Sequence, residues 1–245
     1  MKQYGLIGYP LSHSFSKKFF EQKFIDHGLH DHEFINFELN SIDKFTDLLS
    51  NQPNLSGLSV TIPYKEAIIP FLDELDSTAK EVEAVNTIKI TKSNNSITTK
   101  GFNTDVFGFE ESLKPHFKTE HYKALILGSG GASKAVAFVL KKLGIAYQIV
   151  SRSKGDILYK NIDKQIIEKH LLIVNTTPLG MFPNFDTSPA IPYHYLGKKH
   201  LVFDLVYNPA KSSFLSQSEK NGAQIVNGIK MLELQANKAW TIWNS

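Results

Sequence analysis

The sequence predicts an α/β fold of two domains with mostly parallel strands. A length of 245 residues allows two modest domains. Hydrophobic residues make up 42% and charged residues 21%, a globular mix that excludes a disordered chain. Apolar runs alternate with helical patterns throughout, as in α/β proteins. We expect an N-terminal α/β domain at residues 1–103 and a second domain at 104–228, with a cleft between them and a helix at 229–245 packing on the first domain.

The first half is predicted to build a sheet with intervening helices. Phe19, Phe20, Lys23, Phe24 and His27 recur at three-to-four spacing, which indicates a helix. Pro115 ends a later one. Strands are expected at 4–8, 33–38 and 58–62, helices at 17–27 and 42–49, a hairpin of strands 86–91 and 96–102, and a helix at 104–113.

The second half repeats the alternation of strand and helix. Each predicted strand ends in a polar or glycine- and proline-rich loop, which is where open parallel sheets place ligands. Strands are expected at 124–127, 147–150, 171–175 and 201–205, and helices at 133–143 and from about 231 to the end.

Composition excludes several classes of function. The 27 basic and 24 acidic residues are too balanced for a nucleic-acid binder. No apolar run approaches the ~18 residues that span a bilayer, so we expect no membrane partner. The chain has no cysteine, which excludes a disulfide framework and makes a reducing cytoplasm the natural compartment. His27, His30 and His32 lack a defined carboxylate partner, so no metal site is expected.

The segment GSGGAS follows a predicted strand and opens a predicted helix. Gly128 permits the tight turn, and Gly130 lets the backbone approach a pyrophosphate that faces the first N–H groups of the helix. The strand–helix–strand context favours a dinucleotide site over a plain glycine turn. Ser133 replaces the usual third Gly or Ala, so the match is imperfect. The predicted cofactor contacts in this loop are Gly128, Ser129, Gly130, Gly131 and Ala132.

The end of the next strand predicts the cofactor. An NAD site expects an acid there, about 20 residues on, to bind the ribose hydroxyls. This chain has Ser151, Arg152 and Ser153, and the next acid is Asp156. Arg152, the only arginine, could clamp a 2′-phosphate that a carboxylate would repel. We therefore predict NADP.

Polar clusters complete a recognisable set of motifs. They are GYPLSHSFS, NLSGLSVTIPYKE, EAVNT, GFNTD, GSGGAS, SRS, NTTPLGM, FDLVYNP and NGIKMLELQA. Their order over almost the whole chain closely resembles the shikimate dehydrogenase family. The resemblance implies an N-terminal substrate domain, a Rossmann-like NADP-binding domain, and reversible NADPH-dependent reduction of 3-dehydroshikimate to shikimate in chorismate and aromatic amino-acid biosynthesis.

The resemblance also implies roles for individual residues. Lys65 and Asp105 correspond to the catalytic pair. The positions implied for substrate binding are Ser14, Ser16, Thr61, Lys65, Asn86, Asp105, Tyr207 and Gln235. Thr176, Leu205 and Gly228 fall at positions that line the nicotinamide side of the cofactor. Two departures from the family pattern are Lys17, where Pro is usual, and Ser212, where Thr is frequent.

Alternatives remain at this stage. Taken alone, Lys65 reads as a solvated lysine at a helix start, and Asp105, Ser14 and Ser16 as helix caps. A quinate/shikimate dehydrogenase of broader specificity, or an NADP-binding sensor without turnover, would share most of the motifs. The expected partners are small molecules, with a homodimer allowed.

Overall fold

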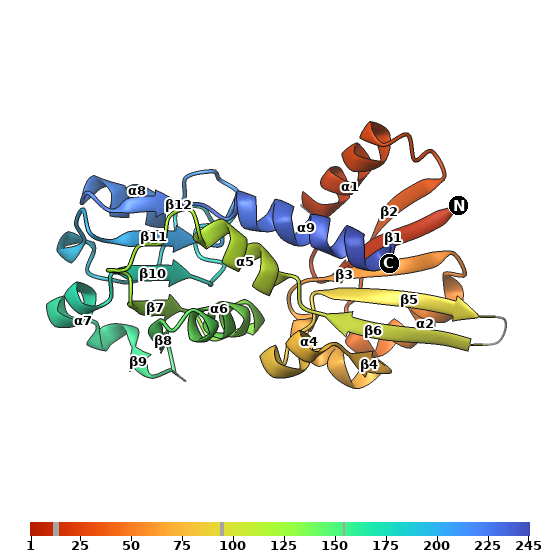
Figure 1. Cartoon of the computed structure of the whole chain (residues 1–245), viewed down its shortest axis with the longest axis horizontal. Coiled ribbons are helices and arrows are strands. Elements are labelled where there is room, and N and C mark those ends of the chain that lie inside the picture. The colour runs from red at the N-terminus through yellow and green to blue at the C-terminus, as the bar shows by residue number, and fades with distance from the viewer. Residues whose placement is uncertain (12–14, 94–95, 154) are drawn as a thin grey trace. The chain divides into compact units, whose positions relative to one another are not determined.

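The computed structural model describes residues 1–11, 15–93, 96–153 and 155–245 and divides the chain into two compact units (Figure 1). Unit 1 comprises Met1–Thr104 and Gln235–Ser245, and unit 2 comprises Asp105–Leu234. Both are α/β, so the predicted fold class is confirmed at the level of each unit.

Unit 1 contains a six-stranded mixed sheet in the order β2-β1-β3-β5-β6-β4. Strand β1 pairs in parallel with β2 and β3, while β3–β5 and the predicted hairpin β5–β6 are antiparallel. The strands are β1 (Lys2–Gly8), β2 (His32–Glu38), β3 (Leu55–Val60), β4 (Glu74–Leu75), β5 (Thr87–Ser93) and β6 (Ser96–Phe102).

Two hydrophobic clusters form the core of unit 1. Successive residues of a strand point to opposite faces, so Leu6 of β1 joins one cluster and Ile7 the other. The helices are α1 (Phe15–Asp26), η1 (Ile42–Lys44), α2 (Phe45–Asn51), α3 (Tyr64–Ala67), η2 (Ile69–Phe71) and α4 (Ser77–Val82). Helix α9 (Ile229–Trp243) contributes its last turns to this unit.

Trp243 fixes the end of α9 in unit 1. Its indole N–H donates a 3.0 Å hydrogen bond to the Ile88 carbonyl, and its ring stacks on Tyr4. A Cβ atom at Gly57 would lie 2.4 Å from the indole. Only glycine therefore lets β3 pass this close to α9.

Unit 2 is built on a parallel six-stranded sheet in the order β12-β11-β10-β7-β8-β9. The chain starts at β7 in the middle, moves outward to β8, and returns to β10 on the other side. This reversal creates a switch point at the carboxyl ends of β7 and β10, where such sheets bind ligands. The strands are β7 (Lys123–Leu127), β8 (Ala146–Ser151), β9 (Ile157–Leu158), β10 (Leu172–Asn175), β11 (Leu201–Asp204) and β12 (Gln224–Val226).

Three short helices were not predicted from the sequence. Helices α4, α7 and α8 have six to eight residues, too few for a clear hydrophobic period. Their signal is the cap: Asp76, Asp163 and Ser212 each accept a hydrogen bond from a backbone N–H in the first turn. The helices of unit 2 are α5 (Asp105–Leu113), α6 (Gly131–Lys142), η3 (Tyr159–Asn161), α7 (Lys164–Lys169), η4 (Tyr193–Tyr195) and α8 (Ser213–Lys220).

Some predicted boundaries were wrong by two or three residues. Strand β3 begins at Leu55 and ends at Val60, because Leu55 is already buried in the core. Helix α6 begins at Gly131, directly after its cap Gly130 and two residues before the predicted start.

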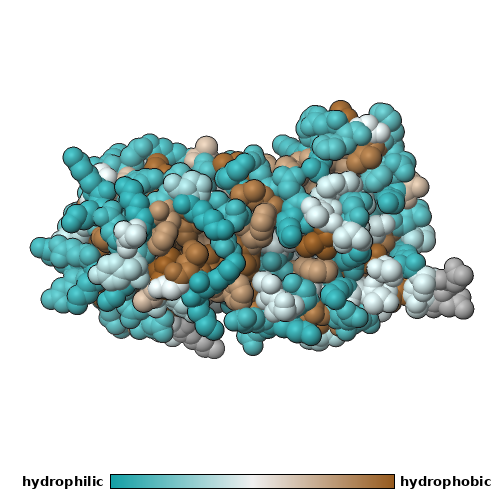
Figure 2. Space-filling view, viewed as in Figure 1, coloured by the Kyte–Doolittle hydropathy of each residue, from teal (hydrophilic) through white to brown (hydrophobic). Residues whose placement is uncertain are grey.

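The face shown in Figure 2 is largely hydrophilic, with hydrophobic residues exposed between the polar ones. Within the described parts of the chain, no helix has the length and apolar character needed to cross a membrane.

Candidate active site

The glycine loop of unit 2 has the geometry of an anion cradle. Gly128 adopts φ +116°, and a Cβ there would lie 2.6 Å from the Thr176 hydroxyl oxygen. Gly130 caps α6 without a side-chain hydrogen bond, and a Cβ there would meet nothing within 4 Å. The first N–H groups of α6 therefore have no side-chain cap and can receive a pyrophosphate. The predicted contacts Ser129, Gly131 and Ala132 lie in the same turn.

At the carboxyl end of β8, Arg152 is exposed, while the nearest acid, Asp156, is hydrogen-bonded to the strand. Asp156 accepts a 2.7 Å hydrogen bond from the backbone N–H of Ile149, which ties its carboxylate to the strand. The hydroxyl of Ser151 accepts from the Ser153 N–H at 3.3 Å. Arg152 is exposed between these serines. A cationic group therefore stands where NAD sites place a carboxylate, and this arrangement suits a 2′-phosphate.

The three residues expected at the nicotinamide side follow the carboxyl ends of three strands: Thr176 follows β10, Leu205 follows β11 and Gly228 comes after β12. Thr176 donates from its backbone N–H (2.9 Å) and its hydroxyl (2.8 Å) to the Leu127 carbonyl. The N–H of Gly228 donates to Val206, and a Cβ on Gly228 would lie only 2.1 Å from the Leu205 carbonyl oxygen. Backbone contact thus brings Leu205 and Gly228 together.

A buried carboxylate, Asp204 of the FDLVYNP motif, lies beside them and was not predicted as a site residue. Asp204 is fully buried and accepts hydrogen bonds from Asn175, Val206 and Ser212. Burial raises the pKa of Asp204 to about 6, although the three donors act in the opposite direction. Its sequence signal is an acid at the end of a buried strand.

In unit 1, two expected substrate contacts are directly paired. The amide NH₂ of Asn86 donates to the side-chain oxygen of Gln235 at 3.3 Å. The side-chain oxygen of Asn86 accepts from the backbone N–H of Thr104 at 2.7 Å, and the hydroxyls of Thr104 and Thr87 lie 3.1 Å apart. Asn86, Thr87 and Thr104 are all buried. Thr87 and Thr104 were not predicted as site residues, although they stand in the EAVNT and GFNTD motifs.

Lys65 lies on the short helix α3, which its neighbours anchor. The hydroxyl of buried Tyr64 donates to the Leu39 carbonyl at 2.5 Å, and the Lys65 carbonyl accepts from Val85 at 2.7 Å. Lys65 itself is half-buried. Thr61, also half-buried, precedes this helix and donates its backbone N–H to Ile7.

The remaining predicted residues are placed individually. Asp105 is the first residue of α5 and is 6% exposed. Ser16 is half-buried in the first turn of α1, and Tyr207 is half-buried after β11. Ser14 lies outside the described residues.

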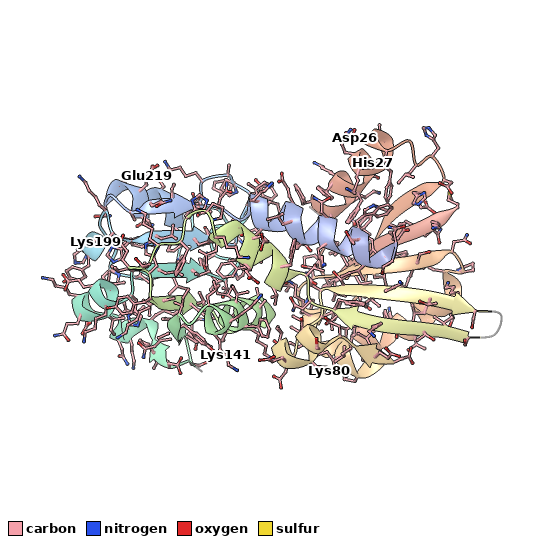
Figure 3. All side chains as sticks on the ribbon, viewed as in Figure 1. Asp26, His27, Lys80, Lys141, Lys199 and Glu219 are labelled. Atoms are coloured by element: carbon pink, nitrogen blue, oxygen red, sulfur yellow. The ribbon has the colours of Figure 1, made fainter. Side chains whose placement is uncertain are left out.

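Two of the three histidines considered as metal ligands are engaged separately. His27 lies with Asp26 at the end of α1 (Figure 3), where its Nδ1 contacts the Lys23 carbonyl at 2.9 Å. His32 Nδ1 bonds to Asp31 at 2.7 Å. Over the described ranges, no group of three or more His, Asp or Glu side chains is arranged to hold a metal.

Comparison with known proteins decides the family. A profile of the shikimate dehydrogenase substrate-binding domain matches residues 6–88. The NADP(+) shikimate dehydrogenase of Methanosphaera stadtmanae is 33% identical over 260 residues, covering 98% of this chain and 90% of the relative. The chain belongs to the shikimate dehydrogenase family. The resemblance predicted from the motifs is confirmed.

Solved shikimate dehydrogenases share the fold over the full length. The Aquifex aeolicus enzyme has a TM-score of 0.85 and 32% identity, covering 100% of this chain and 92% of that chain. The Thermus thermophilus enzyme, in complex with NADP(H) and shikimate, has a TM-score of 0.83 and 27% identity, covering 99% and 93%. Membership of the shikimate dehydrogenase family thus accounts for both units.

Proposed function

We propose that this protein is an NADP-dependent shikimate dehydrogenase, an oxidoreductase that interconverts 3-dehydroshikimate and shikimate in chorismate and aromatic amino-acid biosynthesis. The observation that carries the proposal is that a chain of this family keeps both Lys65 and Asp105, at the starts of α3 and α5. A protein that only senses NADP needs no group for proton transfer.

The residues of unit 2 fit the cofactor. The start of α6, which has no side-chain cap, would hold the pyrophosphate, with Gly128, Ser129, Gly130, Gly131 and Ala132 lining the turn. Arg152, between Ser151 and Ser153, would hold the 2′-phosphate, and Thr176, Leu205 and Gly228 would line the nicotinamide side. We assign cofactor binding to residues 104–228, and substrate binding and catalysis to residues 1–103 together with the helix at 229–245.

The chemistry requires a proton as well as a hydride. NADPH supplies the hydride to the ketone carbon, and negative charge then develops on the ketone oxygen. The Lys65 ammonium donates the proton to that oxygen. Asp105 orients the ammonium and accepts a hydrogen bond from a substrate hydroxyl. Such acid–base assistance contributes about 10²–10⁴ in rate, or roughly 3–5 kcal/mol.

The polar side chains of unit 1 orient the ring. Thr61, Asn86 and Gln235 would bind ring hydroxyls, with the Asn86 amide already fixed by Thr104. Ser14 and Ser16 would hold the substrate carboxylate near the start of α1, where hydroxyl donors and the helix end favour an anion. Tyr207, a residue of unit 2, would contribute a further phenolic hydroxyl.

Nicotinamide absorbance tests the proposal against its alternatives. The protein is offered shikimate or quinate, each with NADP or NAD. Turnover with shikimate and NADP supports the assignment. Comparable turnover with quinate favours the broader quinate/shikimate dehydrogenase, and NADP binding without turnover on either acid favours a sensor.

The remaining sequence-based expectations belong to the same proposal. We place the enzyme in the cytoplasm, where a chain without cysteine needs no oxidising compartment. Its partners are the two small molecules, with no nucleic acid, and a homodimer is the assembly to test by light scattering.

A further inference from the structure

Asp204 is a buried carboxylate that no step of the proposed chemistry uses. It ends β11 and has no exposed surface. One carboxylate oxygen accepts from the Asn175 amide at 2.9 Å and from the Val206 N–H at 3.0 Å. The other accepts from the Ser212 hydroxyl at 2.5 Å. All the hydrogen bonds described for this carboxylate come from unit 2.

The Asn175 bond sets the loop that follows β10. With its NH₂ held by Asp204, the Asn175 side chain presents its oxygen to Thr177. That oxygen accepts from the Thr177 N–H at 3.0 Å and from its hydroxyl at 2.6 Å. The orientation of one amide, fixed by Asp204, therefore determines the course of the backbone on both sides of Thr176.

The Ser212 bond sets the start of α8. The Ser212 hydroxyl gives its hydrogen to Asp204 and accepts from the Leu215 N–H at 3.3 Å. Gly180, at φ +87°, packs against it, since a Cβ there would lie 3.2 Å from the Ser212 Cβ. Gly180, in the loop after β10, thus packs against Ser212, which is itself hydrogen-bonded to Asp204.

The hydrogen bond from the Val206 N–H to Asp204 fixes the backbone at the start of the loop that follows β11. Leu205 lies between Asp204 and Val206, so it is bracketed by the carboxylate and one of its donors. The Val206 carbonyl then accepts from Gly228 at 3.1 Å. Each of the three residues assigned to the nicotinamide side therefore meets a partner of Asp204. Thr176 is the neighbour of Asn175 in sequence, Leu205 is the neighbour of Val206, and Gly228 is hydrogen-bonded to Val206.

The cost of this arrangement argues against a purely structural role. Burying a carboxylate is unfavourable even with three donors, and apolar residues of similar size frequently stabilise a core better. Burial raises the pKa of Asp204 to about 6, which records that cost. A buried charge that orients both the loop after β10 and the loop between β11 and α8 gives positional accuracy in return.

We propose that Asp204 is a positioning residue for the nicotinamide half of the cofactor site, which it holds through Asn175, Val206 and Ser212. This inference rests on the proposed function, since it presumes that the chain binds NADP. It makes a specific prediction: the adenosine half, bound by the glycine loop and Arg152, should not depend on Asp204.

The test separates the two halves of the cofactor by ligand. We would measure dissociation constants by calorimetry for 2′,5′-ADP, which carries only the adenosine half, and for NADPH, in wild type and Asp204→Asn. Asparagine keeps the size and one of the two oxygen acceptors, removes the charge, and puts an NH₂ donor in place of the other oxygen. We expect 2′,5′-ADP binding to stay within about twofold, while NADPH binding and kcat at saturating NADPH each fall about tenfold because the reacting ring is less well positioned.

Two further variants keep the test decisive. Ser212→Ala removes one donor to the carboxylate. It should weaken NADPH binding and lower kcat by a smaller factor than Asp204→Asn, again with 2′,5′-ADP binding unchanged, and it provides a result if Asp204→Asn does not fold. Asp163→Ala removes the cap of α7 in the same unit and should lower thermal stability without separating the two ligands.

Equal weakening of both ligands in Asp204→Asn, or no change in either with kcat intact, would overturn the inference. A wild type that binds neither ligand would overturn the proposed function, and the inference with it. Wild-type turnover of shikimate, together with unchanged Asp204→Asn kinetics, would overturn the inference alone.

Discussion

The backbone N–H of Thr104 donates a 2.7 Å hydrogen bond to the side-chain oxygen of Asn86. The Thr104 hydroxyl lies 3.1 Å from the same oxygen and 3.3 Å from the side-chain oxygen of Gln235. Together these contacts leave the Asn86 NH₂ directed toward Gln235. One threonine thus sets the direction of both amides assigned to the ring hydroxyls of the substrate.

Thr104→Val removes the hydroxyl and keeps both the side-chain shape and the backbone N–H. We expect KM for shikimate to rise about three- to tenfold, since a hydrogen bond is worth about 0.5–1.5 kcal/mol. Steady-state kinetics at saturating NADP measures the change. Thr99→Val is the matched control: it is an equally buried threonine of unit 1, bonded to Asp73, and its loss should lower stability without altering KM. Equal KM changes in both variants would contradict this prediction.

Arg152→Ala should weaken NADPH binding about 10–100-fold, because a charge-assisted bond is worth about 1.5–3 kcal/mol, and should leave NADH binding nearly unchanged. Fluorescence titration with each dinucleotide measures both constants. Lys160→Ala removes another exposed cation of the same unit and should affect neither. Equal losses for NADPH and NADH in Arg152→Ala would refute the assignment of the 2′-phosphate.

The sequence allowed the fold class, the glycine loop and the cofactor to be predicted because these depend on local pattern. The glycines follow a strand and open a helix, and Arg152 falls at a position defined by its distance along the chain. Asp204 and Thr104 could not be assigned in this way. Their partners Asn175, Ser212, Asn86 and Gln235 lie up to 131 residues away in sequence, and only the folded sheet brings them within reach.

Alanine substitution at two glycines with positive φ distinguishes the effect of backbone strain alone from the effect of strain combined with a steric clash. Gly144→Ala, at φ +71° with open space around its Cβ, should cost about 1–2 kcal/mol of stability and preserve NADPH binding. Gly128→Ala adds a contact 2.6 Å from the Thr176 hydroxyl and should weaken NADPH binding at least about tenfold by moving the turn. Thermal unfolding and calorimetry measure the two effects. A Gly128→Ala protein that loses stability but binds NADPH normally would show that the turn is not part of the site.

Two buried histidines should make unit 2 sensitive to acid. Burial lowers the pKa of both His121 and His170. His121 accepts from the Lys118 N–H through Nδ1, so protonation there would set two donors against each other. Because the folded pKa lies below the ordinary 6.5, the unfolded chain binds more protons just below that pH. The free energy of unfolding should therefore fall as the pH drops below about 6.5. Asp204, whose pKa is raised, contributes in the opposite sense as pH falls through about 6.

His121→Gln tests the acid sensitivity, because glutamine can accept and donate at the same place without titrating. The drop in Tm between neutral and mildly acidic buffer should be smaller than in wild type. His30→Gln, an exposed histidine, is the control and should retain the wild-type drop. An identical drop in Tm in wild type and both variants would show that His121 does not cause the acid sensitivity.

The most direct test of the proposed enzyme is reduction of NADP by shikimate, followed by nicotinamide absorbance, in wild type and Lys65→Ala. We predict turnover in wild type, a fall in kcat of about 10²–10⁴ in the variant, and NADP binding unchanged between them. A wild type that binds NADP but does not oxidise shikimate, or a Lys65→Ala protein with full turnover, would contradict the account.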